Sequence, residues 1–564
     1  RLKEGNQRKY TGEASIGTVA SKFVFEGPIF KDKTSFIVSA RRTYIDVLAA
    51  PIIAAINRAA GSSSKLRAGY YFYDANIKLN HTFSEKDRIF VSAYLGRDKA
   101  YVKDKDEYID LDTINTVTNN TGLYWGNITT AFRWNHVFSK RLFANTTLMF
   151  SDYKFDTFME YGEERGERTI ASYKYDYFSG ITDMGGKLDF NYYPTPRHEI
   201  RFGGNYLYHT FKPGVSTYKQ SVDTLSLNQT FGNNPIYANE YYAYLDDNIS
   251  ISGRLKADIG VHYSGFVVKD EWYDSWQPRL SLRYLASETF SVKAAFTTME
   301  QYIHLLTNST IGLPTDLWLP STDSIHPQKS MQGAIGFAYN YKDKWDFTLE
   351  GFYKTMDNLL EYKEGASFFD IGQDWESKIE TGRGWSYGVE FLARKNIGKF
   401  TGWIGYTLAW SWRQFDNLNF GEPFPYKYDR RHDVSVVILY QLNENIDFGA
   451  TWVYGTGNAI TLGVARYEDI GSFFEGMYYY TGEIEHYNGR NSYRSPAYHR
   501  LDVSANFHKK NKLGERTWSV GLYNAYSRQN PFYLYFGYNN WGQRVLKQVS
   551  LFPIIPSVRY SLKF

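Results

Sequence analysis

Apolar and polar residues alternate along the end of the chain at the period of a β-strand. Counting back from the last residue in steps of two gives Phe564, Leu562, Tyr560 and Val558, and a polar residue fills each position between them. Successive side chains of a strand point to opposite faces, so this segment predicts a strand with one apolar and one polar face. Taken alone, this strand also fits the edge of a soluble β-sandwich, so the rest of the chain is needed to identify the fold.

Similar alternating segments recur along the chain, and the connections between them alternate in length. Short polar turns are expected at residues 31–33, 84–87, 139–140, 195–197, 251–254, 287–289, 342–344, 397–399, 443–445 and 512–516. Longer connections are expected at 46–69, 102–122, 160–172, 213–238, 269–275, 306–326, 363–381, 416–429, 464–498 and 538–544, the first of them partly helical. A sandwich or a propeller has no reason to alternate in this way, whereas an outer-membrane barrel has short periplasmic turns and long extracellular loops.

These connections, with a tight bend near Gly12 or Gly17, predict an all-β protein: a transmembrane antiparallel β-barrel of about 22 strands, each ~10–12 residues long. The segment from Leu142 to Thr157 shows the expected two faces, with a slip of register near Thr146. Each unpaired backbone group in hydrocarbon costs several kcal/mol, so the first strand, within residues 1–29, must pair with the last.

The composition agrees with a chain whose strands are apolar on one face only. The 564 residues include 50 Tyr, 39 Phe and 14 Trp, yet the mean hydropathy is −0.48. No apolar run reaches the ~18 residues that a transmembrane helix needs. The chain has no cysteine, which excludes disulfides and thiolate sites. A net charge of +4 gives no reason to expect nucleic acid as a partner.

A barrel of about 22 strands has a lumen too wide for its side chains to fill, and barrels of this size normally hold a plug. Strands and connections use up the whole sequence, so no segment is left to serve as that plug. The chain starts with Arg1 rather than Met, and we expect it to be a processed or partial product.

Several short motifs, in order, resemble the TonB-dependent transporters of Bacteroidetes. They are RLKEGN at 1–6, EGPI at 26–29, KDKTSF at 31–36, SARRTY at 39–44, YDRRHD at 428–433, RLDVS at 500–504, YNAY at 523–526, NPF at 530–532 and FPIIPS at 552–557. In this resemblance, residues 1–10 are the junction with an upstream plug domain, possibly with the first barrel strand, and residues 11–564 are the barrel. The departure from the family is that neither a plug nor a TonB box is present.

The resemblance implies energised import of a scarce nutrient, such as a siderophore, vitamin complex, glycan or peptide, across the bacterial outer membrane. The implied partners are outer-membrane lipid and lipopolysaccharide, the plug, TonB–ExbB–ExbD acting through the plug, the barrel-assembly machinery and a surface lipoprotein. It also implies that the aromatic C-terminus, with Tyr560, Leu562 and Phe564, is an assembly signal. The alternative function is a passive pore, or a structural barrel that scaffolds surface lipoproteins.

One candidate site is the charged stretch Asp429, Arg430, Arg431, His432 and Asp433. A carboxylate and an imidazole are suitable metal ligands, but two adjacent arginines repel a cation. We therefore favour a network of ion pairs and hydrogen bonds that anchors a loop at the mouth of the barrel, and we predict no metal and no cofactor.

The second candidate is the connection at 464–498, which is rich in aromatic residues. Tyrosine gives a large contact area at low entropic cost, as in other binding loops. We predict that this loop recognises the ligand through Phe473, Phe474, Tyr478, Tyr479, Tyr480, His486, Tyr487 and Arg490. Its alternative role is to pack over the mouth of the barrel. The chain has no catalytic motif of a serine hydrolase, zinc protease or phosphate-binding enzyme, so we do not expect an enzyme.

Overall fold

The computed structural model describes residues 3–60, 65–110, 112–222, 225–232, 234–306, 317–366, 375–468 and 483–564. Among these residues, no helix is long and apolar enough to cross a bilayer.

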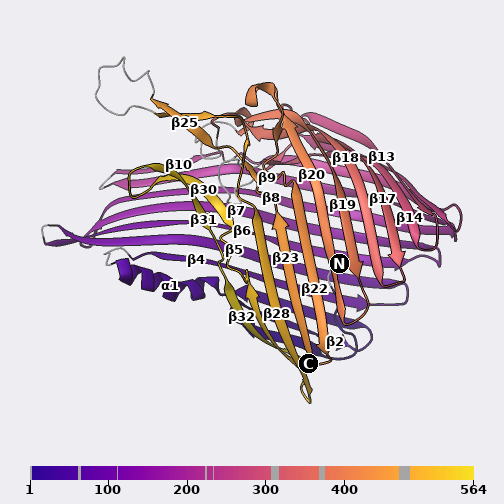
Figure 1. The fold of residues 1–564 in the computed structure, drawn as a ribbon. Helices are drawn as coiled ribbons and strands as arrows, with labels where there is room; N and C mark the ends of the chain where they lie inside the picture. The colour runs from indigo at the N-terminus through magenta and orange to yellow at the C-terminus, as the bar shows by residue number, and fades with distance from the viewer. Residues whose placement is uncertain are drawn as a thin grey trace.

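Twenty-two antiparallel strands form a closed barrel, as predicted (Figure 1). The wall strands are β1 (Thr11–Gly17), β2 (Ala20–Phe30), β3 (Thr34–Thr43), β4 (Arg67–Thr82), β5 (Asp87–Asp110), β6 (Thr113–Val137), β7 (Leu142–Arg165), β8 (Arg168–Thr195), β9 (His198–Val222), β11 (Ile236–Ser250), β12 (Leu255–Val268), β13 (Glu271–Leu285), β14 (Phe290–Gln301), β17 (Gln328–Tyr341), β18 (Trp345–Tyr362), β19 (Ile379–Lys395), β20 (Phe400–Gln414), β22 (His432–Asn443), β23 (Ile446–Gly455), β28 (Tyr498–Asn511), β29 (Gly514–Tyr523) and β32 (Ile555–Lys563). Each pairs with the next wall strand along the chain, so the barrel is an up-and-down meander.

The remaining elements belong to the connections at the extracellular end. They are the helix α1 (Ile45–Ala60), the strands β10 (Leu225–Phe231), β15 (Ile303–Leu306), β16 (Leu317–Pro320), β21 (Phe424–Pro425), β24 (Ala459–Ile460), β25 (Gly463–Glu468), β26 (Glu483–Tyr487), β27 (Tyr493–Arg494), β30 (Pro531–Tyr538) and β31 (Arg544–Ser550), and the 3₁₀ helices η1 (Trp375–Lys378) and η2 (Asn419–Gly421). The helix α1 confirms the predicted helical part of the first long connection, and in Figure 1 it lies beside β4.

The first and last strands close the ring, as the cost of unpaired backbone requires. β1 pairs with β32 in antiparallel register, with Ala14 opposite Leu562 and Ile16 opposite Tyr560. Beyond the last of these pairs, the amide of Gly12 donates to the carbonyl of Phe564 over 2.8 Å, and the amide of Phe564 donates back over 2.9 Å. The last residue of the chain is therefore part of the seam.

Residues 3–10 precede the first strand and are held against the wall. The Ser35 hydroxyl donates to the carbonyl of Gly5 over 2.7 Å, and Lys3 pairs with the buried carboxylate of Glu26. The assignment of residues 1–10 as a junction with a plug stays a prediction.

Three of the predicted connections are extensions of strands instead. The segments expected as loops at 102–122, 160–172 and 213–238 lie largely in the hairpins β5–β6, β7–β8 and β9–β10, and β8 alone spans 28 residues. The predicted strand length of ~10–12 residues was therefore wrong for this part of the wall. The backbone of β5–β6 and β7–β8 remains paired to the tips of these hairpins, although the sequence there lacks the apolar alternation of a strand in lipid.

Two further expectations were also wrong. The connection at 269–275 is a two-residue turn, because β12 ends at Val268 and β13 begins at Glu271. β7 has no slip near Thr146, since its register with both neighbours is continuous from Phe143 to Glu163. Phe155 lies on the opposite face from the exposed Leu148, so it points to the inner face, and it is 1% exposed.

The outer face of the wall is apolar and exposed. On β17, for example, the alternate residues Met331, Ile335 and Phe337 are all exposed. On the final strand, Val558 and Phe564 are also exposed, and the ring of Tyr560 packs against Trp518 with 5.0 Å between centroids. This face is the one that contacts lipid.

We predict that deletion of Phe564 lowers the fraction of barrel that folds into a membrane, because the two hydrogen bonds to Gly12 are lost at the seam. Electrophoresis of unheated samples, which separates folded from unfolded barrel, measures that fraction. Phe564→Ala keeps the backbone bonds and removes the ring, so it separates pairing from the proposed assembly signal. An unchanged folded fraction in the deletion variant would contradict the prediction.

Candidate ligand-binding site at the extracellular mouth

A hairpin folds into the lumen at the extracellular end. The chain leaves the wall after β14, and β15 and β16 pair from Ile303 opposite Pro320 to Leu306 opposite Leu317. Side chains of this hairpin form one apolar cluster with β7 and β8 on one side and with β18 and β19 on the other. The members of that cluster are Phe155, Tyr175, Tyr177, Leu306, Leu317, Leu319, Ile325, Leu360, Tyr362 and Ile379. Six wall strands separate β8 from β18, so the hairpin bridges distant parts of the ring.

A second apolar cluster fixes the start of the hairpin to the wall. The ring of Tyr302 stacks on Phe266 of β12 with 5.0 Å between centroids, and both rings are buried. The Tyr302 hydroxyl lies 2.8 Å from the Ser264 hydroxyl, which also accepts a hydrogen bond from Gln277. The mouth is therefore narrowed by a packed layer.

His304 lies inside that layer. It is fully buried, and its Nε2 is 3.0 Å from the Ser321 hydroxyl. Burial disfavours the charged imidazolium and lowers the pKa of His304 to about 4. The hairpin is therefore packed around a neutral histidine.

Beside the apolar layer, Glu361 at the end of β18 binds two arginines. Its carboxylate accepts hydrogen bonds from Arg413 of β20 over 2.7 Å and from Arg490 over 3.0 Å. The side chains of Glu361 and Arg490 are buried, and that of Arg413 is 12% exposed. The guanidinium of Arg413 also stacks on the Tyr426 ring at 3.6 Å. Charge-assisted bonds of this kind join the ends of β18 and β20 to the connection that follows β26.

A second ion-pair group lies at the top of β20. The carboxylate of Asp429 is buried, accepts the amide of Ser411 over 2.7 Å, and pairs with Arg494 and with Arg431. Arg494 also donates to the carbonyl of Asp429, so the segment between β20 and β22 is tied to β27.

The other residues of the predicted charged stretch lie apart from this group. Arg430 is 3.7 Å from Asp433, and His432 is 2.9 Å from the Tyr406 hydroxyl. Within the described ranges, no group of His, Asp and Glu is placed to hold a metal ion. The arrangement can hold connections together. The role of the five residues as a loop anchor stays a prediction.

The predicted ligand-contacting residues divide into three sets. Phe473, Phe474, Tyr478, Tyr479 and Tyr480 lie outside the described residues. His486 and Tyr487 lie on β26, exposed, where the Tyr487 hydroxyl donates to Glu485 over 3.0 Å. Arg490 is buried against Glu361 instead of facing solvent with them. Their role in ligand recognition stays a prediction.

Glu485 is a charged centre on the exposed hairpin β25–β26. Arg466 donates to its carboxylate over 2.9 Å, and Arg544 of β31 donates to the same oxygen. Burial alone would raise the pKa of the Glu485 carboxyl, but the bonds from Arg466 and Tyr487 outweigh it and lower that pKa. Two separate hairpins of the extracellular end are thereby joined.

Sequence analysis missed Glu361 and Arg413. Glu361 follows Leu359 and Leu360 and precedes Tyr362, and a carboxylate inside an apolar run needs a partner if the run is buried. That signal was available. The identity of its partners was not, because Arg490 lies 129 residues further along the chain.

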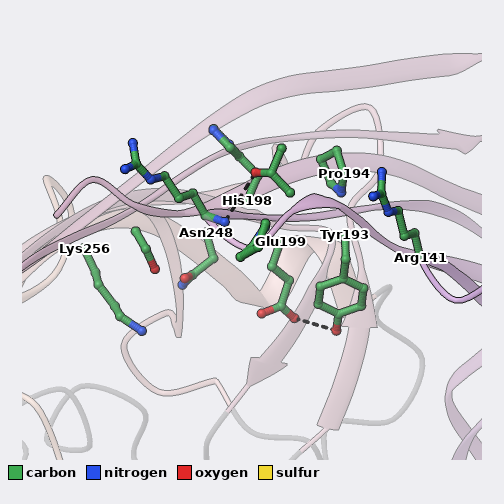
Figure 2. Close-up of a pocket in the computed structure, with 11 residues that line it drawn as sticks. Arg141, Tyr193, Pro194, His198, Glu199, Asn248 and Lys256 are labelled. Atoms are coloured by element: carbon green, nitrogen blue, oxygen red, sulfur yellow. Dashed lines mark hydrogen bonds between the residues drawn. The ribbon is translucent and has the colours of Figure 1, made fainter. Parts of the chain in front are cut away.

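The periplasmic rim has a separate hollow of about 420 Å³ (Figure 2). Arg141, Arg197, Lys256 and Glu199 are among its lining residues, and Glu199 accepts a hydrogen bond from Tyr193 over 3.3 Å. Lys256 also begins a row of cations across the wall, because Arg283 lies directly opposite Lys256. Lys293 lies directly opposite Arg283 in turn. Like charges in directly opposite positions repel, and Asp258 and Glu350 line a neighbouring hollow together with these three cations.

We predict that Glu361→Gln destabilises the packed mouth by about 3–5 kcal/mol, because the buried Arg490 and the largely covered Arg413 would lose their anion. Hydrogen exchange at residues 359–362 and 490–494 measures the loss of protection. The matched control is Glu364→Gln: Glu364 also faces Arg490, at 3.6 Å, but is 64% exposed, and its loss should cost about 0–1 kcal/mol. Equal effects of the two variants would show that burial does not set the strength of this network.

We also predict that acid releases the β15–β16 hairpin. The pKa of His304 falls from 6.5 in the open chain to about 4 when the hairpin is docked. Docking is therefore fully stable above pH 6.5 and loses about 3 kcal/mol as the pH falls to 4. Hydrogen exchange at residues 303–306 and 317–320 between pH 4 and 7 measures this release. His304→Gln should remove the pH dependence, and a variant that keeps it would contradict the assignment.

Comparison with known proteins agrees with the architecture. Residues 54–525 match the family model described as TonB dependent receptor-like, beta-barrel. No curated protein sequence matches the chain.

Three solved structures share the fold at low sequence identity. The ferric yersiniabactin uptake receptor FyuA from Yersinia pestis is 13% identical, with 99% of this chain and 80% of FyuA covered and a TM-score of 0.63. The FrpB iron transporter from Neisseria meningitidis is 12% identical, with 99% and 82% covered and a TM-score of 0.60. The ferric-catecholate import receptor Fiu from E. coli K12 is 12% identical, with 100% and 82% covered and a TM-score of 0.59.

The family model covers most of the chain, and the structure supplies the closed wall that the family requires. This chain therefore belongs to the TonB-dependent receptor-like β-barrel family, and it is an outer-membrane protein.

Proposed function

We propose that this chain is the barrel of an energised outer-membrane importer that takes up a scarce nutrient such as a siderophore, vitamin complex, glycan or peptide. The observation that carries the proposal is the mouth, where an inward hairpin bridges β7–β8 and β18–β19 within a wall of this family. A passive pore gains nothing from a packed apolar layer across its entrance. An importer needs a narrowed mouth that holds a ligand before it is admitted.

The proposed ligand site is the extracellular end between that layer and the hairpin β25–β26. The described stem of this hairpin carries His486 and Tyr487, and its connection holds the aromatic residues predicted to contact the ligand. In Figure 1, β25 lies at the end of the molecule opposite the C-terminus. The buried pairs around Glu361 and Asp429 would anchor the connections from which this site is built.

The proposed importer includes a plug domain in the lumen, on which TonB, with ExbB and ExbD, acts. The row of Lys256, Arg283 and Lys293, with Asp258 and Glu350 beside it, supports such a partner, because it gives the wall a charged surface against which a plug would pack. The barrel-assembly machinery and a surface lipoprotein over the mouth are further proposed partners.

Growth of the native bacterium under separate limitation of iron, cobalamin and glycans tests the proposal. Loss of the gene should impair growth under one limitation, and loss of TonB should impair it equally. Growth that depends on the barrel but not on TonB would favour the passive pore. Growth that depends on neither would contradict import and leave the structural scaffold.

A further inference from the structure

The outer, lipid-facing wall has a groove of about 560 Å³ across β17 to β20. We call it the outer groove. It is lined by Gly333 and Ile335 of β17, Gly351 and Tyr353 of β18, Tyr387 of β19 and Trp410 of β20.

The register of the strands places these residues on one face. Gly333 lies opposite Tyr353, and Tyr353 lies opposite Tyr387. Trp410 continues the row opposite Tyr387. Directly opposed residues share a face of a sheet. The same face carries Ile335, Leu349 and Val389, which are 51%, 44% and 45% exposed, so the groove opens toward hydrocarbon.

The two glycines of the groove have no structural reason to be glycine. A Cβ added at Gly333 would meet no atom within 4 Å, and one at Gly351 would meet only the carbonyl of Gly388 at 3.9 Å. Neither residue has a left-handed backbone. Glycine inside a strand weakens it and often marks a close approach by another molecule. The missing side chains therefore leave space that a partner can fill.

Stacked rings form the wall of the groove beside these glycines. The rings of Tyr353 and Tyr387 are 6.4 Å apart at 20°, and those of Tyr387 and Trp410 are 5.2 Å apart at 14°. A flat aromatic surface next to a glycine floor fits a narrow, extended apolar chain better than a bulky side chain.

Three cations lie on the extracellular side of the groove. The guanidinium of Arg431 stacks on the Trp410 ring at 4.7 Å, and its Nε is buried without a hydrogen-bond partner. Arg383 precedes Tyr387 by four residues on β19, and Lys329 precedes Gly333 by four residues on β17. Both strands begin at the extracellular end, so the two cations lie nearer that end than the groove does.

The acidic groups near these cations are only partly engaged with them. Glu300 is 4.0 Å from Lys329, Asp357 lies opposite Lys329 in the register, and Asp429 is 3.6 Å from Arg431. Among the described residues, the hydrogen-bond acceptor of Arg383 is the neutral Gln414, over 3.0 Å and 3.2 Å. Positive charge therefore lies on the extracellular side of the groove, where Arg383 has a neutral partner.

We propose that the outer groove is a binding site for one phosphorylated lipid of the outer leaflet, with an acyl chain against Gly333, Gly351 and the stacked rings and a phosphate near Arg383, Lys329 and Arg431. The occupant must come from the membrane, because the groove faces it. The cations distinguish an anionic lipid from a neutral one. The site requires only that the barrel be in the outer membrane and does not rest on the import function.

Native mass spectrometry of the purified full chain tests this site. The barrel is stripped of lipid by detergent exchange and titrated with diphosphorylated lipid A or with its dephosphorylated form. We expect one tightly held diphosphorylated lipid. Gly333→Leu with Gly351→Leu fills the groove and should weaken binding about tenfold. Arg383→Gln with Lys329→Gln should weaken only the phosphorylated lipid, which separates headgroup from chain recognition.

The matched control is Gly186→Leu on β8. This glycine lies between the exposed Met184 and Leu188 on alternate positions, and Leu148 already covers it at 3.3 Å, so no hollow is present there. Equal lipid binding by the groove variant and this control would overturn the proposal. So would equal binding of the two lipid forms by the unaltered chain. The proposal would also be overturned if the unaltered barrel formed a dimer that the groove variant did not form, because a second copy of the chain would then be the occupant of the groove.

Discussion

The pairing of β1 with β32 is the constraint on which the rest of the structure depends. A sheet in hydrocarbon cannot leave an edge open, because water is absent to satisfy its backbone groups. The seam extends to the final residue, where Gly12 and Phe564 exchange two hydrogen bonds. Everything else follows from a closed ring: an outer face that must be apolar, an inner face free to carry charge, and a lumen wide enough to need filling.

The parts of the fold that touch lipid could be predicted from the sequence. Segments such as Val558 to Phe564 alternate between apolar and polar residues, and short turns join them at one end. This pattern predicted the number of strands and the closure of the barrel. The hairpin above residue 102 could not be predicted in this way. Water bathes both faces there, so Lys103 to Asp106 carries no apolar period, although each residue pairs across to β6. Backbone pairing sets the length of this hairpin and the position of its tip, and the pattern of apolar side chains does not indicate where that pairing ends.

The site shows the same division between local and distant information. The charge of the Asp429 stretch was visible, and its burial with Arg494 was not. Glu361 shows why. Its two arginines come from β20 and from the connection after β26, and the sequence around Glu361 gives no indication of either partner. Phe155 gives a second example. An apolar side chain on a two-faced strand is expected to face lipid, whereas Phe155 packs inward against the β15–β16 hairpin.

That hairpin also has a mechanical consequence. A ring of 22 strands one sheet thick is a thin-walled tube, and such a tube resists stretching far better than it resists being squashed into an oval. By joining β7–β8 to β18–β19 through a densely packed layer, the hairpin acts as a cross-brace at one rim. The opposite rim, joined by short turns, has no such strut among the described residues. Lateral pressure from the bilayer should therefore deform the two ends of the tube unequally, with the braced end keeping its circular outline.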